Sequence, residues 1–332
     1  MKNEDVRGNL WSIVLAGGDG GRTKEFIRRW LGYEKPKQYC TFVGTRSMFQ
    51  HTLDRAARLT PWERVVVVAA RHHQREVWDQ LDGRPASMVL FQPKNVDTAA
   101  GVFLALTYIL ARDPLATVVI YLSDHFISPE GSFLMAVDQA VRGSNSLGGR
   151  LVLLAARPDS LDLEYGWIQP GHLLGLPGTA AIHAVKTFIE KPDEAIAREA
   201  RATGSLWNTM VLAAKGTQLW SLGWKCFPDM MPRFERLKDT IDTTEQLRVI
   251  EEIYEDLPNR NFSAHLLQRV PERLAVMEMK MSFGVTGVIL NASCRASKIS
   301  GDGQLMLKPH ARSFTWDDGM IGTFCHKGDM TQ

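Results

Sequence analysis

The 332-residue chain has few cysteines and no long apolar run. Its four cysteines lie far apart without a C-x-x-C pair, so their spacing indicates neither a zinc site nor a disulfide framework. No stretch approaches the roughly eighteen apolar residues that a membrane span requires. The apolar run near the N-terminus, about six residues long, is too short for the core of a signal peptide. We therefore expect a cytoplasmic protein with no membrane partner.

A charge excess is also missing. Lys and Arg total 39 against 37 Asp and Glu, which gives a net charge of +2. Because so balanced a chain has no large electrostatic field of one sign, we do not expect nucleic acid as a partner. Local cationic pockets for phosphate groups are still compatible with this balance. Internal repeats and low-complexity segments are absent, and the length suits one large α/β domain or two smaller ones.

Short apolar runs alternate with helical patterns through the first two thirds of the chain, which predicts an α/β fold. The run Val65–Val68 is apolar at every position, which is typical of a strand buried on both faces in a parallel sheet. The predicted strands are 12–16, 64–70, 88–92, 117–122, 151–156, 182–189 and 209–213. The predicted helices are 47–59, 74–81, 98–111 and 130–142.

Ligands of such a sheet bind beyond the carboxyl ends of its strands. Three predicted strand ends carry polar or glycine-rich segments, namely Gly17–Arg22, Gln92–Thr98 and Ser123–His125. We expect these segments to converge on one site. The region from about Asn291 to Gln332 shows no sustained period, and we expect it to be irregular or weakly β.

The first of these segments contains four glycines among five residues and ends at Arg22. Glycine allows positive φ and close approach of backbone N–H groups to phosphate oxygens, and Arg22 and Lys37 would add positive charge. The segment lacks the Gly-Lys-Ser/Thr of a P-loop and the third glycine of a dinucleotide fingerprint. A purely structural turn between strand and helix is the alternative.

Asp124 follows a buried strand, where a carboxylate can hold Mg²⁺. The alternative is that Asp124 caps the next turn, and His125 looks structural rather than catalytic. Three later positions also have two interpretations each. Gly166 lies between two aromatic residues that could be core residues, Glu190 could be a surface charge before a proline, and Asn208 could be a turn residue before a strand.

The order of these motifs resembles that of sugar-phosphate nucleotidyltransferases, and more narrowly of mannose-1-phosphate guanylyltransferases. The resemblance covers about residues 11–287. It implies a Rossmann-like nucleotidyltransferase fold with a mainly parallel mixed sheet, a catalytic domain at 1–287 and a diverged C-terminal segment at 288–332. The motifs that carry it are Leu15-Ala-Gly-Gly-x-Gly-x-Arg22, Pro36-Lys-Gln38, Gln92-Pro-x-Asn95-x-x-Thr98-Ala99, Ser123-Asp-His125, Tyr165-Gly-Trp-Ile168, Phe188-x-Glu-Lys-Pro192 and Trp207-Asn208.

The reaction that the resemblance implies joins mannose 1-phosphate to GTP, giving GDP-mannose and pyrophosphate, with Mg²⁺ as cofactor. Its catalytic residues would be Arg22, Lys37, Lys191 and Asp124, with Arg22 and Lys37 on the β- and γ-phosphates, Lys191 on the sugar phosphate and Asp124 on Mg²⁺. The nucleotide would be bound by Leu15, Gly17, Gly18, Gly20, Gln92 and Thr98. The hexose would be bound by Gly166, Glu190 and Asn208.

The sequence departs from the family pattern at two places. The segment after the phosphate loop, Thr23–Trp30, is more basic than in the family, and Val285 occupies the position where the family has the aspartate that is its second metal ligand. Because a valine cannot coordinate Mg²⁺, we expect reduced activity. One alternative is an enzyme that uses another hexose 1-phosphate or another nucleotide. The other is a non-catalytic homologue that binds a nucleotide sugar. A homodimer is compatible with the sequence, which does not fix the oligomeric state.

Overall fold

The computed structural model describes residues 8–42, 44–85, 89–175, 181–279 and 290–291. Its strands are β1 (Leu10–Ala16), β2 (Val65–Ala70), β3 (Val89–Gln92), β4 (Thr117–Leu122), β5 (His125–Phe126), β6 (Leu151–Ala156), β7 (Gly166–Leu173), β8 (Ile182–Glu190), β9 (Leu206–Lys215), β10 (Leu274–Glu278) and β11 (Leu290–Asn291). Its helices are α1 (Lys24–Leu31), α2 (Met48–Ala57), α3 (Gln74–Gln80), α4 (Thr98–Arg112), α5 (Glu130–Ser146), α6 (Glu194–Ala202), α7 (Gly216–Cys226), α8 (Met231–Lys238), α9 (Gln246–Glu255) and α10 (Phe262–His265).

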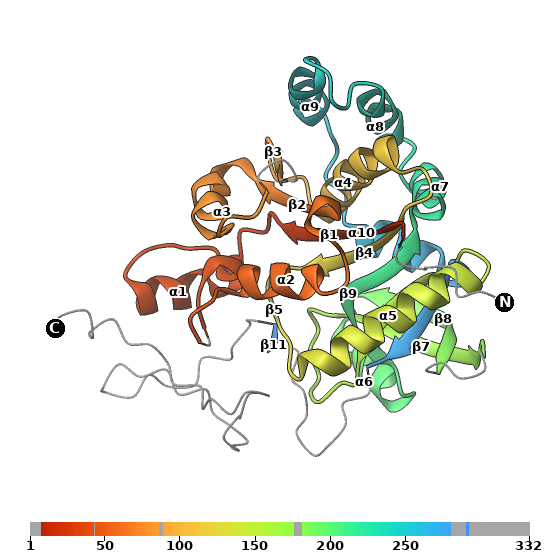
Figure 1. Cartoon of the computed structure of the whole chain (residues 1–332). Helices are drawn as coiled ribbons and strands as arrows, with labels where there is room; N and C mark the ends of the chain where they lie inside the picture. The colour runs from red at the N-terminus through yellow and green to blue at the C-terminus, as the bar shows by residue number, and fades with distance from the viewer. Residues whose placement is uncertain (1–7, 43, 86–88, 176–180, 280–289, 292–332) are drawn as a thin grey trace.

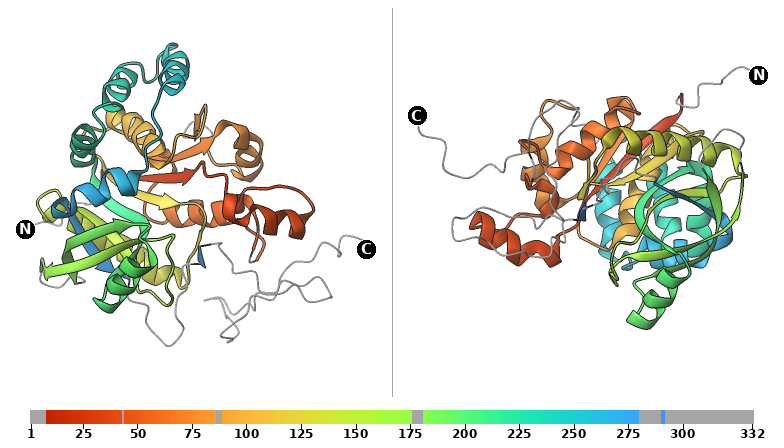
Figure 2. Two further views of the ribbon diagram at one scale, coloured as in Figure 1. Left: turned by 180° about the vertical axis from the view of Figure 1, so that it is seen from behind. Right: turned by 90° about the horizontal axis from the view of Figure 1, so that it is seen from below.

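Nine strands form one mixed sheet in the order β3-β2-β1-β4-β9-β6-β10-β8-β7. Strands β1 to β4 are mutually parallel where they pair, and β9 is antiparallel to both β4 and β6. The expected α/β fold with a mainly parallel mixed sheet is confirmed. Strand β7 also pairs with β9, so the last five strands of the sheet close on themselves, as the view from below in Figure 2 shows for the green and blue strands.

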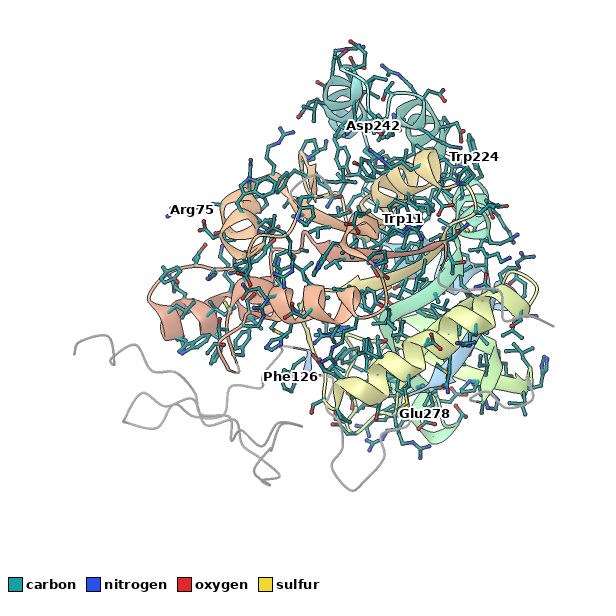
Figure 3. The ribbon with its side chains drawn as sticks, in the orientation of Figure 1. Trp11, Arg75, Phe126, Trp224, Asp242 and Glu278 are labelled. Atoms are coloured by element: carbon teal, nitrogen blue, oxygen red, sulfur yellow. The ribbon has the colours of Figure 1, made fainter. Side chains whose placement is uncertain are left out.

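Helices cover both faces of the sheet because alternate residues of each central strand point to opposite sides. Trp11 and Ile13 of β1 belong to a core with α4 and α7–α10, whereas Leu10 and Val14 belong to a core with α2, α3 and α5. Figure 1 shows α4, α7, α8 and α9 on one side of the central strands and α2 and α5 on the other. Trp11 lies in the middle of the fold, while Arg75 and Asp242 lie at its periphery (Figure 3).

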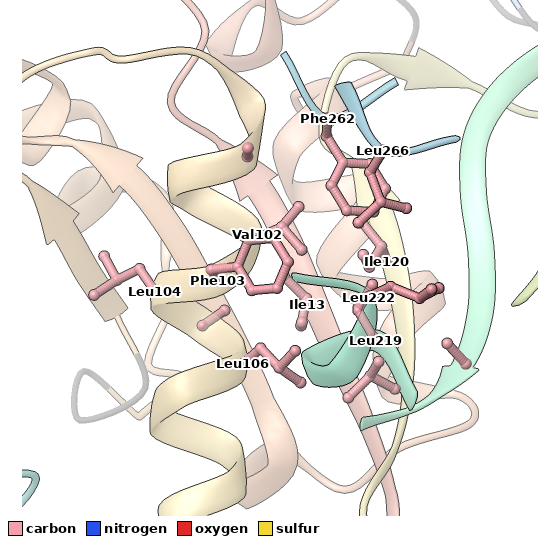
Figure 4. Packing of buried hydrophobic residues seen from close by; sticks show 14 of the residues in the cluster. Ile13, Val102, Phe103, Leu104, Leu106, Ile120, Leu219, Leu222, Phe262 and Leu266 are labelled. Atoms are coloured by element: carbon pink, nitrogen blue, oxygen red, sulfur yellow. The ribbon is translucent and has the colours of Figure 1, made fainter. Parts of the chain in front are cut away.

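Phe103 of α4 is the centre of the first core and is fully buried (Figure 4). Its ring packs edge to face on Phe227, with the two centroids 5.6 Å apart, and it also contacts Phe262 of α10. Gly223 allows α7 to approach this ring, because a Cβ there would lie 2.5 Å from Phe103 Cε1. The core thus joins α4, whose N-terminus follows the third strand end, to the C-terminal helices.

The structure corrects several sequence-based boundaries. Strand β9 begins at Leu206, so Asn208 lies inside a strand and not in a turn before one. Strands β7 and β10 were not predicted, because Pro170, Gly166 and Gly171 interrupt the first and the second is only five residues long. The C-terminal helices α7 to α10 were also missed. The proposed boundary at residues 287 and 288 lies outside the described residues.

None of the helices in the described ranges combines the length and apolarity needed to cross a bilayer.

Replacing Phe103 with alanine is expected to lower the free energy of unfolding by about 3–5 kcal/mol, because it removes a fully buried ring and leaves a cavity. The matched control is Leu115→Ala, since Leu115 is 78% exposed and should change stability by no more than about 0.5 kcal/mol. Urea unfolding followed by circular dichroism measures both. Equal midpoints for the two variants would contradict the central role of Phe103.

Candidate active site

A cavity of about 650 Å³ lies at the carboxyl ends of β1, β3 and β4. The three predicted strand-end segments meet there, as expected for parallel strands of one sheet. The residues at this cavity that the sequence singled out are Leu15, Gly17, Gly18, Gly20, Lys37, Gln92, Thr98 and Asp124. Their individual roles stay predictions. The structure nevertheless brings a glycine loop, a lysine and a carboxylate to one cavity.

The segment that follows Pro36 is hydrogen-bonded to the backbone of the glycine loop. Gln38 Nε2 donates to the backbone oxygens of Ala16 (3.0 Å) and Gly18 (2.8 Å), and Tyr39 donates its hydroxyl to Ala16 at 3.0 Å. Gly20 has φ of +64°, a left-handed conformation that favours glycine. These contacts satisfy loop oxygens from the protein side, so we infer that the loop is shaped before any ligand arrives.

Lys37 and Asp124 form an ion pair in the cavity, with Lys37 Nζ 2.5 Å from Asp124 Oδ2. Their side chains are only 14% and 22% exposed. Burial acts to raise the pKa of Asp124, but the charge and the hydrogen bond of Lys37 outweigh it and lower that pKa, so the carboxylate is ionised. Burial lowers the pKa of His125 to about 4, and this histidine is therefore neutral, in line with its predicted structural role.

Asp124 fits the requirements of one Mg²⁺ ligand. Its Oδ2 faces Lys37, while its Oδ1 is buried and has no hydrogen-bond partner among the described residues. Such an oxygen is costly to bury and is suited to a hard cation. Val285, where the family has its second carboxylate, lies outside the described residues. Asp97 also lines the cavity and supplies a second carboxylate that the sequence did not single out.

Gln92 lines the cavity and is held by α9. Tyr254 donates its hydroxyl to Gln92 Oε1 at 3.1 Å, and both side chains are buried. Burial raises the pKa of Tyr254, so its phenol stays a donor. Gln92 Nε2 then points toward the glycine loop, where a Cβ on Gly17 would lie 2.8 Å from it. A larger residue at position 17 would therefore displace the Gln92 amide.

The start of α10 is hydrogen-bonded to the start of α4. Thr98 Oγ1 accepts from the backbone N–H of Phe262 at 2.9 Å, and Asn261 donates its amide to Asp97 Oδ1 at 3.2 Å. Asp97 has φ of +68°, a strained conformation for a residue with a side chain. The Thr98 hydroxyl thus has a structural partner, and its predicted contact with the nucleotide ribose would use the remaining lone pair or its proton.

Two of the predicted hexose residues contact the same C-terminal elements. Asn208 Nδ2 donates to Ser263 Oγ at 3.4 Å, and the backbone N–H of Glu190 donates to Gln268 Oε1 at 2.8 Å. Gly166 is opposite Glu190 in the β7–β8 pair, and a Cβ there would lie 2.6 Å from Glu190 Oε2. The absence of a side chain at position 166 therefore makes room for the Glu190 carboxyl group.

Glu190 is not the surface charge that its position before a proline allowed. Burial raises its pKa to about 7. The charge of Lys191 acts to lower this pKa, and the charges of Asp97 and Glu164 act to raise it. Its Oε2 is buried without a hydrogen-bond partner in the described part of the chain. Asp97, whose charge acts on this pKa, lines the cavity, whereas Glu190 itself does not.

Two predicted cations are less well defined. Lys191 is half exposed, has φ of +46°, and pairs with Glu164 at 3.2 Å. Arg22 belongs to the short helical turn Gly21–Thr23, and its side chain lies outside the described part of the structure.

A separate cavity of about 810 Å³ lies beside α5 and the ends of β6 and β10. Because none of the predicted site residues lines it, the smaller cavity is the candidate site.

Tyr254 and Asn261 were missed by sequence reasoning, since both lie more than 150 residues from the segments that they support. Gln38 belongs to the Pro36-Lys-Gln38 motif, but sequence reasoning assigned it no role. Its hydrogen bonds to Ala16 and Gly18 depend on the fold, and its distance along the chain from the glycine loop does not reveal them.

A family model described as "Nucleotidyl transferase" matches residues 11–237. The Xanthan biosynthesis protein XanB of Xanthomonas campestris pv. campestris is 34% identical over 202 residues, which cover 59% of this chain and 40% of the relative. Mannose-1-phosphate guanylyltransferase RfbM of Salmonella typhimurium is 31% identical over 204 residues, with the same two coverages of 59% and 40%. The match therefore spans less than half the length of these curated relatives.

Solved structures share the fold. One named mannose-1-phosphate geranyltransferase, from Thermus thermophilus, has a TM-score of 0.69 at 24% identity, covering 82% of this chain and 74% of that chain. Another, named mannose-6-phosphate isomerase, from Helicobacter pylori, has a TM-score of 0.65 at 19% identity, covering 83% of this chain and 100% of that chain. At these identities the likeness concerns the fold alone.

The raised pKa of Glu190 predicts a pH dependence of stability. Between the ordinary glutamate pKa and about 7, the folded state binds more protons at this position than the unfolded state does, so stability falls as pH rises through this window. Glu190→Gln removes this loss. The measurement is the melting temperature of the variant minus that of wild type. This difference should be more positive at pH 8 than at pH 5, by on the order of 1–3 °C.

The control for this experiment is Glu199→Gln, on the exposed side of α6. It should change the melting temperature by the same small amount at both pH values. A Glu190→Gln variant whose difference from wild type is equally independent of pH would show that the carboxyl group titrates normally.

Proposed function

The chain belongs to the nucleotidyl transferase family, and from this premise we propose that it transfers the guanylyl group of GTP to mannose 1-phosphate and releases pyrophosphate. The observation that carries the proposal is the Lys37–Asp124 ion pair, which faces the glycine loop across one cavity. A cation, a carboxylate and open backbone amides are the groups that a triphosphate and its metal ion require.

Mannose 1-phosphate is proposed as the acceptor because of the relatives. RfbM is named as a mannose-1-phosphate guanylyltransferase, and its match to this chain covers 59% of the chain. A polyhydroxylated acceptor is supported by Glu190, whose buried Oε2 has no hydrogen-bond partner among the described residues, and by the buried amide of Asn208, which contacts Ser263 beside α4. Lys191 is the proposed partner of the acceptor's phosphate.

GTP is proposed as the donor because of the orientation of Gln92. With Oε1 taken by the Tyr254 hydroxyl, the amide N–H₂ faces the loop and can donate to a base. Guanine offers a carbonyl oxygen at position 6, whereas adenine presents an amino group there, which is itself a donor. Two donors facing each other leave both unsatisfied in a buried site, so the arrangement favours GTP over ATP.

In the proposed reaction, a phosphate oxygen of mannose 1-phosphate attacks the α-phosphorus of GTP, and the bond to the bridging α–β oxygen breaks. The electron pair leaves with pyrophosphate, and no covalent enzyme intermediate forms. Lys37, Arg22 and the loop amides would bind the departing phosphates and stabilise their negative charge. Asp124 would hold Mg²⁺, which when bound offsets the charge of the two reacting anions.

This proposal predicts pyrophosphate release that requires GTP, mannose 1-phosphate and Mg²⁺ together. Lys37→Met should lower kcat/KM on the order of 100-fold, because it removes the buried cation that faces the phosphates. Lys215→Met, at an exposed lysine at the end of β9, is the matched control and should keep the wild-type rate. Calorimetry that detects GDP-mannose binding without any turnover would instead favour the non-catalytic homologue.

Tyr254→Phe tests the orientation of Gln92. Without the hydroxyl, the amide can turn over, so we expect the ratio of kcat/KM for GTP to that for ATP to fall roughly 2- to 10-fold, the worth of one hydrogen bond. Tyr121→Phe removes a buried hydroxyl from the core on the opposite face of the sheet and serves as the control. An unchanged ratio in Tyr254→Phe would mean that Tyr254 does not select the base.

A further inference from the structure

Two histidines and an aspartate meet at the rim of the nucleotide cavity. Asp19 lies in the glycine loop after β1, and His72 and His73 end the short helical turn Arg71–His73 that follows β2. Because β1 and β2 are adjacent parallel strands, their carboxyl ends bring the two segments side by side. The ligand atoms of the three side chains all lie within 4.8 Å of one another.

The distances are close to those of a metal site. Asp19 Oδ1 is 2.7 Å from His72 Nε2 and 3.3 Å from His73 Nε2. Tetrahedral zinc with bonds of about 2.0–2.1 Å separates neighbouring ligand atoms by about 3.3 Å. The Asp19–His73 distance already matches this value. The Asp19–His72 distance would have to open by roughly half an ångström, which the exposed side chain of His72 (58% exposed) can accommodate.

We propose that Asp19, His72 and His73 form a binding site for a divalent transition metal of the zinc type. Two imidazoles and one carboxylate suit Zn²⁺, Co²⁺ or Ni²⁺ rather than Mg²⁺, which prefers oxygen ligands. Three protein ligands leave at least one coordination position for water or another oxygen ligand, as in open zinc sites. The site is separate from Asp124, and its occupancy does not depend on the proposed nucleotidyl transfer.

The surroundings give the three ligands different freedom. His73 is only 4% exposed, and its ring packs edge to face on Tyr39, with centroids 5.5 Å apart, so it is a fixed ligand. Asp19 lies between Gly18 and Gly20, which both line the nucleotide cavity, and Asn95 donates to Asp19 Oδ2 at 3.4 Å. A bound metal would therefore tie the glycine loop to the end of β2. We infer that metal binding stiffens this loop.

The test uses the full chain, freed of metal with a chelator and kept without nucleotide or Mg²⁺. Titration with Co²⁺, followed by its visible ligand-field absorption and by calorimetry, should detect a site in the wild-type protein. His72→Gln should weaken binding to this site at least about tenfold, because it removes one of three ligands. Asp19→Asn should weaken it as well. Circular dichroism checks that both variants are folded.

The matched control is His172→Gln, at an exposed histidine in β7. Other cysteines and histidines of the chain can also take up Co²⁺, so the measured quantity is the difference between each variant and wild type. The proposal holds if His72→Gln loses a site that His172→Gln retains. It is overturned if His72→Gln and wild type give the same isotherm, or if the wild-type protein takes up no Co²⁺ at millimolar concentration. In either case the three side chains form a hydrogen-bonded cluster and not a metal site.

Discussion

The ion pair between Lys37 and Asp124 is the contact on which the candidate site depends. It joins the segment after the glycine loop to the end of β4, and both of its charged side chains are largely buried. Charges are expensive to bury unless they are paired. The pair holds both groups in place, as the proposed binding of a triphosphate by Lys37 and of a metal ion by Asp124 would require.

The second half of the chain holds other residues of the candidate site. The segment around α10 contacts Thr98, Asp97 and Asn208, and α9 orients Gln92 through Tyr254. Within the described ranges, three of the non-glycine residues with positive φ, namely Asp97, Lys191 and Met210, lie at or beside the site. Backbone strain of this kind persists only where surrounding contacts enforce it, and it is concentrated at functional sites. The C-terminal elements supply those contacts.

The central strands and the phosphate loop could be predicted because their signals are local. A run such as Val65–Val68 indicates a strand buried on both faces. The glycines before Arg22 come directly after another such run, at the end of β1. Strand β7 could not be predicted in this way, since Gly166 and Pro170 break its pattern and its pairing with β8 and β9 forms the strand. The same holds for Asn208, whose place inside β9 depends on partners in β4, β6 and β7.

The sequence by itself determined the α/β class, the order of the strand ends and the family, because periodicity, glycine spacing and motif order are properties of short segments. Only the tertiary structure decided which groups share an environment. Burial turned Glu190 from a surface charge into a carboxyl group with a raised pKa, and the adjacency of β1 and β2 placed Asp19 against His72 and His73. Burial and proximity depend on how distant segments pack, and no local pattern records them.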